Sequence, residues 1–249
     1  MKGLLFIGIV LFGLVSSIYG DLTDNFESYT LNTWPSSNWV PDGNAKTDTT
    51  HNTIALDPAN PTNQVLKLYG VVGSFWAALT YNAYSFPTDY VIEASVFNGT
   101  EVIPTSGHEV RASIGMRNGV YWNSATNPVR NLILFHKDGH ICAGDYSFLG
   151  TYETDRWYDV KIHYQRIGDD LLLEYWLDGS FLGDRTSIIS NLSIEESLDH
   201  IELAAGAGSA YFDDIHVSPV PIPGAVLLGA IGLSMAGLKL RKRICENRS

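Results

Sequence analysis

The chain has 249 residues and a formal net charge of −11 at pH 7, with 16 Lys and Arg against 27 Asp and Glu. A surface this acidic repels nucleic acid and anionic lipid, so we exclude a nucleic-acid partner and expect cations or neutral molecules such as sugars. Aromatic residues make up 12% of the chain, and its length allows one domain with a substantial core.

The first 20 residues have the pattern of a secretory signal peptide. Lys2 gives a positive start, residues 3–15 are apolar, and small residues occur at 16–20. An apolar run this short is typical of a cleaved leader rather than a membrane-spanning helix. We therefore expect residues 21–219 to be exported as one domain.

Residues 21–219 have the pattern of short strands separated by turns. Tyr90, Ile92, Ala94 and Val96 alternate with Glu93 and Ser95 in one such run, which predicts a strand with one buried face. Expected strands lie at 65–69, 76–81, 90–97, 109–116, 131–136, in a three-strand unit at 157–182, and at 201–204 and 211–217. Turns are expected at the Asn-Gly or Asp-Gly pairs 42–43, 98–99, 118–119, 138–139 and 178–179. This pattern predicts an all-β, two-sheet antiparallel sandwich, with a loop or one helical turn at 188–198.

The two cysteines do not predict a disulfide. Cys142 lies in the exported part and Cys245 beyond the C-terminal apolar run, so the membrane should separate them. Between Ile141 and Ala143, Cys142 is expected to be a small buried hydrophobe rather than a nucleophile.

Three motifs carry a family resemblance. They are Asp-Asn-Phe-Glu-Ser-Tyr at 24–29, Trp-Tyr-Asp-Val at 157–160 with the Leu-Asp-Gly turn at 177–179, and Tyr-Phe-Asp-Asp-Ile at 211–215. They resemble the laminin-G-like, concanavalin A-like jelly rolls of secreted bacterial proteins, which implies a jelly-roll sandwich over most of the exported part. Galactose-binding-like jelly rolls share the end motifs and are the alternative fold. Both kinds include binders and enzymes, so the resemblance does not fix an activity.

The two end motifs hold four carboxylates, on Asp24, Glu27, Asp213 and Asp214. The first and last strands of a jelly roll often lie side by side, and like charges brought together need a counter-ion. Ca²⁺ takes about six to eight oxygen ligands and would serve. We predict a structural Ca²⁺ site here, the alternative being that these side chains cap turns or face water.

No catalytic motif is present. The Glu-x-Asp-x-Glu strand of concanavalin A-like glucanases is missing, and Glu174 and Asp178 have the wrong spacing for it. Glu93 and Glu202 stand alone on their expected strands, and there is no Gly-x-Ser-x-Gly or phosphate loop. This favours a non-catalytic protein and leaves a glycoside hydrolase or lyase as the alternative.

Aromatic side chains are the candidates for binding sugar, because a flat apolar ring matches the C–H face of a pyranose. The candidates are Tyr121, Trp122, Trp76 and Trp176, the first two in a Gly- and Asn-rich stretch that favours exposure. Burial in the core is the alternative for each. We expect a surface or matrix protein that binds polysaccharide, with a purely structural matrix component as a third possibility.

The C-terminal residues form three parts. Val220-Pro221-Ile222-Pro223-Gly224 begins the segment, an apolar run continues to Leu238, and a basic cluster ends at Arg243. The run 220–238 is near the lower length limit for a helix that spans a hydrocarbon layer about 30 Å thick. The basic cluster should stay cytoplasmic, followed by the tail 244–249.

This segment, 220–243, resembles the PEP-CTERM sorting signal of Gram-negative-type bacteria. The match comprises the Val-Pro-x-Pro core and the Gly-Ala-Val-Leu-Leu-Gly run after it, whereas Ile222 replaces the usual Glu and a tail follows the basic cluster. The resemblance implies an exosortase partner and a route through the inner membrane to the cell envelope, the cell surface or the exterior. An ordinary C-terminal membrane anchor is the alternative.

Overall fold

The computed structural model describes residues 21–35, 38–46, 48–70, 77–81, 89–100, 109–117, 129–167, 170–188 and 200–220. The chain divides into two compact units, Met1–Pro219 and Val220–Ser249, and every described residue but Val220 belongs to the first. Within these ranges, no helix is long and apolar enough to cross a membrane. The expected leader, the membrane span and the sorting-signal residues after Val220 lie outside the described residues and stay predictions.

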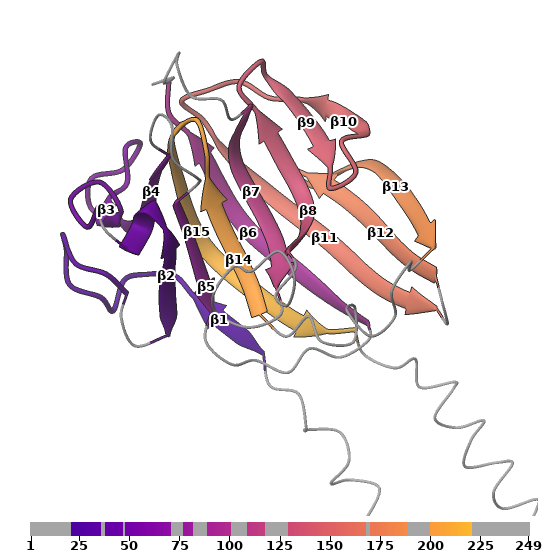
Figure 1. Cartoon of the computed structure of the whole chain (residues 1–249), viewed down its shortest axis with the longest axis horizontal. Coiled ribbons are helices and arrows are strands. Elements are labelled where there is room, and N and C mark those ends of the chain that lie inside the picture. The colour runs from indigo at the N-terminus through magenta and orange to yellow at the C-terminus, as the bar shows by residue number, and fades with distance from the viewer. Residues whose placement is uncertain are drawn as a thin grey trace, which may run out of the picture. The chain divides into compact units, whose positions relative to one another are not determined.

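The described part of the first unit forms two antiparallel sheets, stacked in Figure 1. The eight-stranded sheet has the order β13-β12-β11-β6-β15-β4-β3, and β1 also pairs with β15. Its strands are β1 (Leu22–Asp24), β3 (Thr53–Leu56), β4 (Gln64–Gly70), β6 (Asp89–Asn98), β11 (Trp157–Ile167), β12 (Asp170–Leu177), β13 (Ser180–Ile188) and β15 (Gly208–Pro219). The prediction of an all-β, two-sheet antiparallel sandwich is confirmed.

The seven-stranded sheet has the order β10-β9-β8-β7-β14-β5-β2. Its strands are β2 (Trp39–Gly43), β5 (Ala77–Tyr81), β7 (Val110–Arg117), β8 (Val129–His136), β9 (His140–Ala143), β10 (Phe148–Thr151) and β14 (His200–Ala205). A single 3-10 turn, η1 (Asn44–Lys46), follows β2. The chain therefore passes repeatedly between the two sheets rather than completing one before starting the other.

The core lies between the facing sides of the sheets. The four residues predicted for the buried face of β6, Tyr90, Ile92, Ala94 and Val96, are 4% exposed or less. The Tyr90 ring stacks on the Tyr164 ring of β11 with 4.6 Å between centroids. Because successive side chains of a strand point to opposite faces, this burial turns the residues between them outward.

The sequence predictions missed several short strands and misplaced one turn. β1, β2, β3, β9 and β10 were not predicted, because segments of three to five residues are too short to show alternation. The predicted turn at 42–43 is wrong, since Asp42 and Gly43 pair with β5 inside β2. The turn at Asp178 and Gly179 is confirmed by φ angles of 49° and 74°, as a tight two-residue hairpin requires.

Cys142 on β9 is buried and forms no disulfide. Burial raises the pKa of its thiol, and the charges of Asp138 and Asp145 add to the shift. The prediction that Cys142 is a buried residue is confirmed, and the raised pKa disfavours the thiolate, which is the reactive form.

Asp24 ties the two sheets together at the N-terminal side of the sandwich. It lies on β1, which pairs with the last strand β15, and its carboxylate accepts a hydrogen bond from Trp39 Nε1 of β2 at 2.8 Å. The same carboxylate accepts hydrogen bonds from Tyr29 Oη at 2.7 Å and from the backbone N–H of Phe26 at 3.0 Å. Since Trp39 belongs to the opposite sheet, this carboxylate links the sheets through a buried polar contact.

We expect Asp24→Ala to lower the free energy of unfolding by about 3 kcal/mol, because it leaves buried donors without an acceptor. Asp170→Ala is the matched control: Asp170 is an exposed Asp at the start of β12, and we expect a change below about 0.5 kcal/mol. Urea unfolding of the full-length chain in detergent measures both. Equal losses for the two variants would contradict the role assigned to Asp24.

Candidate functional site

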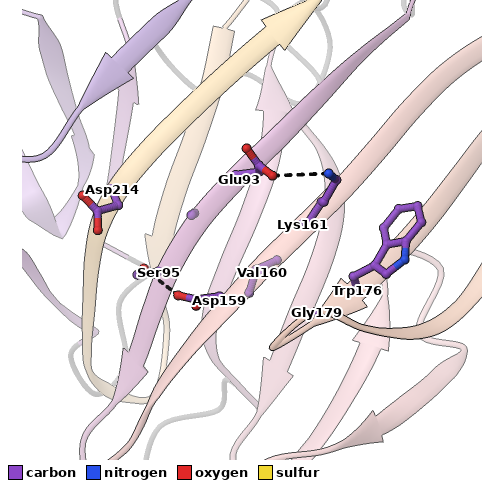
Figure 2. Close-up of a pocket in the computed structure, with 9 residues that line it drawn as sticks. Glu93, Ser95, Asp159, Val160, Lys161, Trp176, Gly179 and Asp214 are labelled. Atoms are coloured by element: carbon purple, nitrogen blue, oxygen red, sulfur yellow. Dashed lines mark hydrogen bonds and ion pairs between the residues drawn. The ribbon is translucent and has the colours of Figure 1, made fainter. Parts of the chain in front are cut away.

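A pocket of 610 Å³ opens on the outer face of the eight-stranded sheet (Figure 2). Its size lies within the usual range for small-ligand sites. The residues that line it come from β6, β11, β12, the turn after β12, and β15: Glu93, Ala94, Ser95, Asp159, Val160, Lys161, Trp176, Gly179 and Asp214.

The strand register places the pocket's side chains next to one another. Glu93 pairs with Lys161, and Lys161 pairs with Trp176, so the three lie in one row across β6, β11 and β12. Ser95 and Asp159 form the next row. Each row points outward because its neighbours along the strands are buried in the core.

Trp176 is the predicted sugar-stacking residue that the structure places in the pocket. Its ring is half-buried and lies 5.3 Å from the ring of Phe181, which is 55% exposed. Lys161 Nζ lies 6.0 Å from the centroid of the Trp176 ring. An aromatic surface therefore borders the pocket on the side of β12 and β13.

Polar groups fill the space between Trp176 and the opposite side of the pocket, where Figure 2 places Asp214. Glu93 Oε1 lies 3.4 Å from Lys161 Nζ, and Ser95 Oγ donates a hydrogen bond to Asp159 Oδ1 at 3.0 Å. Asp159 and Asp214 are exposed, and neither has a cationic partner within the described residues. The pocket thus offers hydrogen-bond acceptors beside an aromatic ring.

The other predicted aromatic residues are not placed by the structure. Trp76, Tyr121 and Trp122 lie outside the described residues, so their roles stay predictions.

The four carboxylates predicted to bind Ca²⁺ occupy different environments. Asp24 accepts the hydrogen bonds that link the sheets, and Asp214 lines the pocket. Asp213 is buried and pairs with Ser95 across the sheet, and its Oδ2 accepts a hydrogen bond from Asn63 Nδ2 at 2.8 Å. Glu27 Oε1 accepts a hydrogen bond from the backbone N–H of Gln64 at 2.9 Å.

Burial raises the pKa of Asp213 to about 6, and the nearby charges of Asp214 and Glu27 add to the shift. This is the repulsion that a counter-ion would relieve. In the described part of the chain, however, no three His, Cys, Asp or Glu side chains gather closely enough to hold a metal ion. The pairing of first and last strands is confirmed, whereas the four carboxylates do not form one ligand set, and calcium binding stays a prediction.

A second polar cluster, Asp42–Arg117–Glu202, lies on the seven-stranded sheet and was missed by sequence reasoning. Arg117 is fully buried; its Nη1 lies 2.5 Å from Asp42 Oδ2, and its Nη2 contacts Glu202 Oε2. Lys46 Nζ lies 2.7 Å from the second oxygen of Asp42. Glu202 is the one carboxylate of β14, as expected, but it contacts Arg117 of the neighbouring strand β7. The only sequence signal was a charged residue in the apolar strand His-Ile-Glu-Leu-Ala-Ala.

Burial raises the pKa of Glu202 to about 7, and the charge of Asp42 adds to this while that of Arg117 opposes it. The native state therefore holds a proton at Glu202 between about pH 4.5 and 7, where an unfolded Glu has released it. The contribution of Glu202 to the free energy of unfolding therefore decreases as pH rises through that range, by up to about 1.4 kcal/mol per pH unit.

Two variants test this cluster. Arg117→Ala should lower the free energy of unfolding by about 3–5 kcal/mol, because it leaves the buried carboxyl groups of Asp42 and Glu202 without their cationic partner. Glu202→Gln keeps the shape of the neutral form, so it should cost less and should flatten the pH dependence of stability between about pH 4.5 and 7. Urea titrations at several pH values measure both effects; an unchanged pH slope in Glu202→Gln would contradict the raised pKa.

No protein-family model matches the chain, and no curated protein sequence is similar to it. One solved structure similar to this chain is described by the words "Prominent members of the human gut microbiota express endo-acting O-glycanases to initiate mucin breakdown". It has a TM-score of 0.52 at 12% identity and covers 80% of this chain and 99% of its own.

Two further structures have lower TM-scores. The carbohydrate recognition domain of Emp46p has a TM-score of 0.47 at 11% identity, over 75% of this chain and 90% of its own. Alginate lyase vAL-1 from Chlorella virus has a TM-score of 0.45 at 12% identity, and the match covers 74% of this chain and 93% of the lyase chain. At such identities a likeness shows the fold alone. The likeness at 0.52 therefore supports the sandwich fold, and function has to be argued from the site.

Proposed function

We propose that this chain is an exported, non-catalytic protein that binds polysaccharide in the pocket on the eight-stranded sheet. The observation that carries the proposal is the position of Trp176, whose half-buried ring borders a pocket lined with hydrogen-bond acceptors. A pyranose has an apolar C–H face and a rim of hydroxyl donors. The Trp176 ring can stack on the C–H face, and the oxygens of Glu93, Asp159 and Ser95 can accept hydrogen bonds from the hydroxyl groups.

The pocket's own groups favour binding over catalysis. Glu93 contacts two neighbouring side chains: its Oε1 lies 3.4 Å from Lys161 Nζ, and its Oε2 lies 3.3 Å from His216 Nδ1. Both oxygens of Glu93 are therefore engaged by side chains of the protein, which favours a role in holding a ligand.

The alternative, a glycoside hydrolase or lyase, rests on Glu202. A pKa of about 7 is suited to a general acid, and Arg117 stands beside it. However, Glu202 is 1% exposed, so a glycan would first have to displace the groups that cover it. A structural matrix component with no small ligand is the third possibility.

Export, membrane sorting and calcium belong to the proposal as sequence-based parts. The leader 1–20 and the segment 220–243 support passage across the inner membrane, processing by an exosortase, and delivery to the cell envelope, surface or exterior. Glu27 and Asp213 are the carboxylates whose repulsion supports a Ca²⁺ ion at the end motifs.

A polysaccharide array on the full-length chain in sugar-free detergent tests binding. We expect Trp176→Ala to weaken the best binder about tenfold or more, because it removes the aromatic anchor. Phe148→Ala, which removes an exposed aromatic ring on the other sheet, should leave affinity unchanged. Unaltered affinity in Trp176→Ala would refute this site, and release of reducing ends or unsaturated products, lost in Glu202→Gln, would establish the enzyme alternative.

Processing is tested by intact-mass measurement of the protein from its native host. Pro221 and Pro223 keep the segment before the span from becoming helical, so an embedded enzyme can reach it. We expect a mature mass that lacks residues 224–249, and retention of the full tail when both prolines are replaced by Ala. A wild-type mass that includes 244–249 would make the segment an uncleaved anchor.

A further inference from the structure

We propose that the pocket selects polysaccharides whose sugars carry a free ammonium group, that is, 2-amino-2-deoxy sugars. The inference rests on the proposed function and deepens it by naming the chemical class of the ligand.

The charges that line the pocket are unbalanced. Three carboxylates, on Glu93, Asp159 and Asp214, face one cation, Lys161. Lys161 Nζ is already committed to Glu93 Oε1 at 3.4 Å, on the same side as the Trp176 ring. Within the described structure this leaves Asp159 and Asp214 without a cationic partner, and both are exposed.

The surrounding cations are paired with carboxylates of their own. His163 lies 2.7 Å from both Glu174 and Asp89, and Arg156 pairs with Asp178 beside the turn after β12. His163 and Arg156 contact carboxylates outside the pocket lining, and His216 contacts Glu93, the carboxylate that Lys161 already pairs with, at 3.3 Å. Within the described residues, none of the three contacts Asp159 or Asp214. The surplus charge around the pocket is therefore negative.

This surplus determines which sugars bind well. A uronic or sialic acid would bring a further negative charge next to Asp159 and Asp214 and be repelled. A neutral sugar would bind through stacking and hydroxyl hydrogen bonds alone. An ammonium group in place of one hydroxyl would form a charge-assisted hydrogen bond to a carboxylate, which is roughly twice as strong as a neutral one.

The pocket fits an amino sugar better than two other cations. A metal ion needs several oxygens converging on one point, and among the described residues no three metal-binding side chains do so. A lysine-rich peptide would supply ammonium groups, but it has no ring to stack on the flat surface of Trp176. An amino sugar presents both the apolar face and the charge within one small unit.

The test compares four probes on the full-length chain in sugar-free detergent at about pH 5.5, where amines are protonated and ordinary carboxylates ionised. The probes are the hexamers of glucosamine and of N-acetylglucosamine, a hexamer of guluronate, and polylysine. We expect the glucosamine hexamer to bind about tenfold more tightly than its acetylated counterpart, and guluronate to bind least. The gap should narrow as NaCl rises from about 0.01 to 0.15 M, because the screening length falls from about 30 to 8 Å.

Variants assign the preference to the pocket. Asp159→Asn with Asp214→Asn should abolish the preference for the amine while the acetylated hexamer still binds. Asp214 has a φ of 47°, which Asn tolerates, so this pair should fold. Asp170→Asn, an exposed carboxylate at the far end of β12, removes a charge outside the pocket and should leave the preference intact.

The outcomes separate the two proposals. Equal affinity for both glucosamine hexamers, with Trp176→Ala weakening both, would overturn the amino-sugar inference and leave polysaccharide binding standing. Failure of every glycan in the array and of both glucosamine hexamers would overturn both. A third outcome is that polylysine binds as tightly as the glucosamine hexamer and loses this binding in the Asp159→Asn, Asp214→Asn variant. That result would show a cationic peptide to be the ligand and would overturn the inference.

Discussion

Hydrophobic burial of one face of the eight-stranded sheet sets the positions of the residues that form the pocket. β6, β11 and β12 each alternate between buried and outward residues. Their register pairs buried residues with buried residues and outward residues with outward residues. A slip of β11 by one residue would turn Lys161 and Asp159 into the core and expose Val160 and Ile162. Burying those charges costs far more than any local rearrangement gains, so the register is strongly fixed. The row Glu93–Lys161–Trp176 is a consequence of core packing.

The two sheets treat their outer faces differently. On the eight-stranded sheet the outward side chains are partly exposed, and the pocket forms among them. On the seven-stranded sheet all of β14, and all of β7 after Val110, are buried on both faces, so Arg117 and Glu202 have to satisfy each other. A buried ion cluster is poor support for a binding function, since its charges are neutralised within the protein. This contrast is why we place ligand binding on the eight-stranded sheet.

Residues close in sequence were predicted well, and residues brought together only by folding were not. The strand at 90–97 and the Asp178-Gly179 hairpin follow from alternation and turn chemistry within a few residues. Asp24 was predicted as a possible ligand because of its charge, but its contact with Trp39 of the opposite sheet depends on how β1 and β2 meet. Glu202 was separated from Arg117 by 85 residues, and no local pattern joins them.

The same distinction applies to the pocket. Trp176 was predicted as a sugar-stacking residue from its type, and Asp214 as a metal ligand from its neighbours in the chain. Their sharing of one pocket depends on the order of β12, β11, β6 and β15 in the sheet, which no single segment specifies. Asp159 was not predicted at all, because outward carboxylates on strands are common and its row with Ser95 becomes evident only in the register.

An NMR titration of the full-length chain in sugar-free detergent, with the six Trp indoles labelled with ¹⁵N, tests ligand binding at the pocket most directly. Trp176 borders the pocket, whereas Trp39 is 2% exposed in the core and is an internal reference. On addition of glucosamine hexamer, the account predicts a saturable shift of the Trp176 indole N–H signal and no change at Trp39. A Trp176 signal that stays in place while the hexamer binds would contradict it.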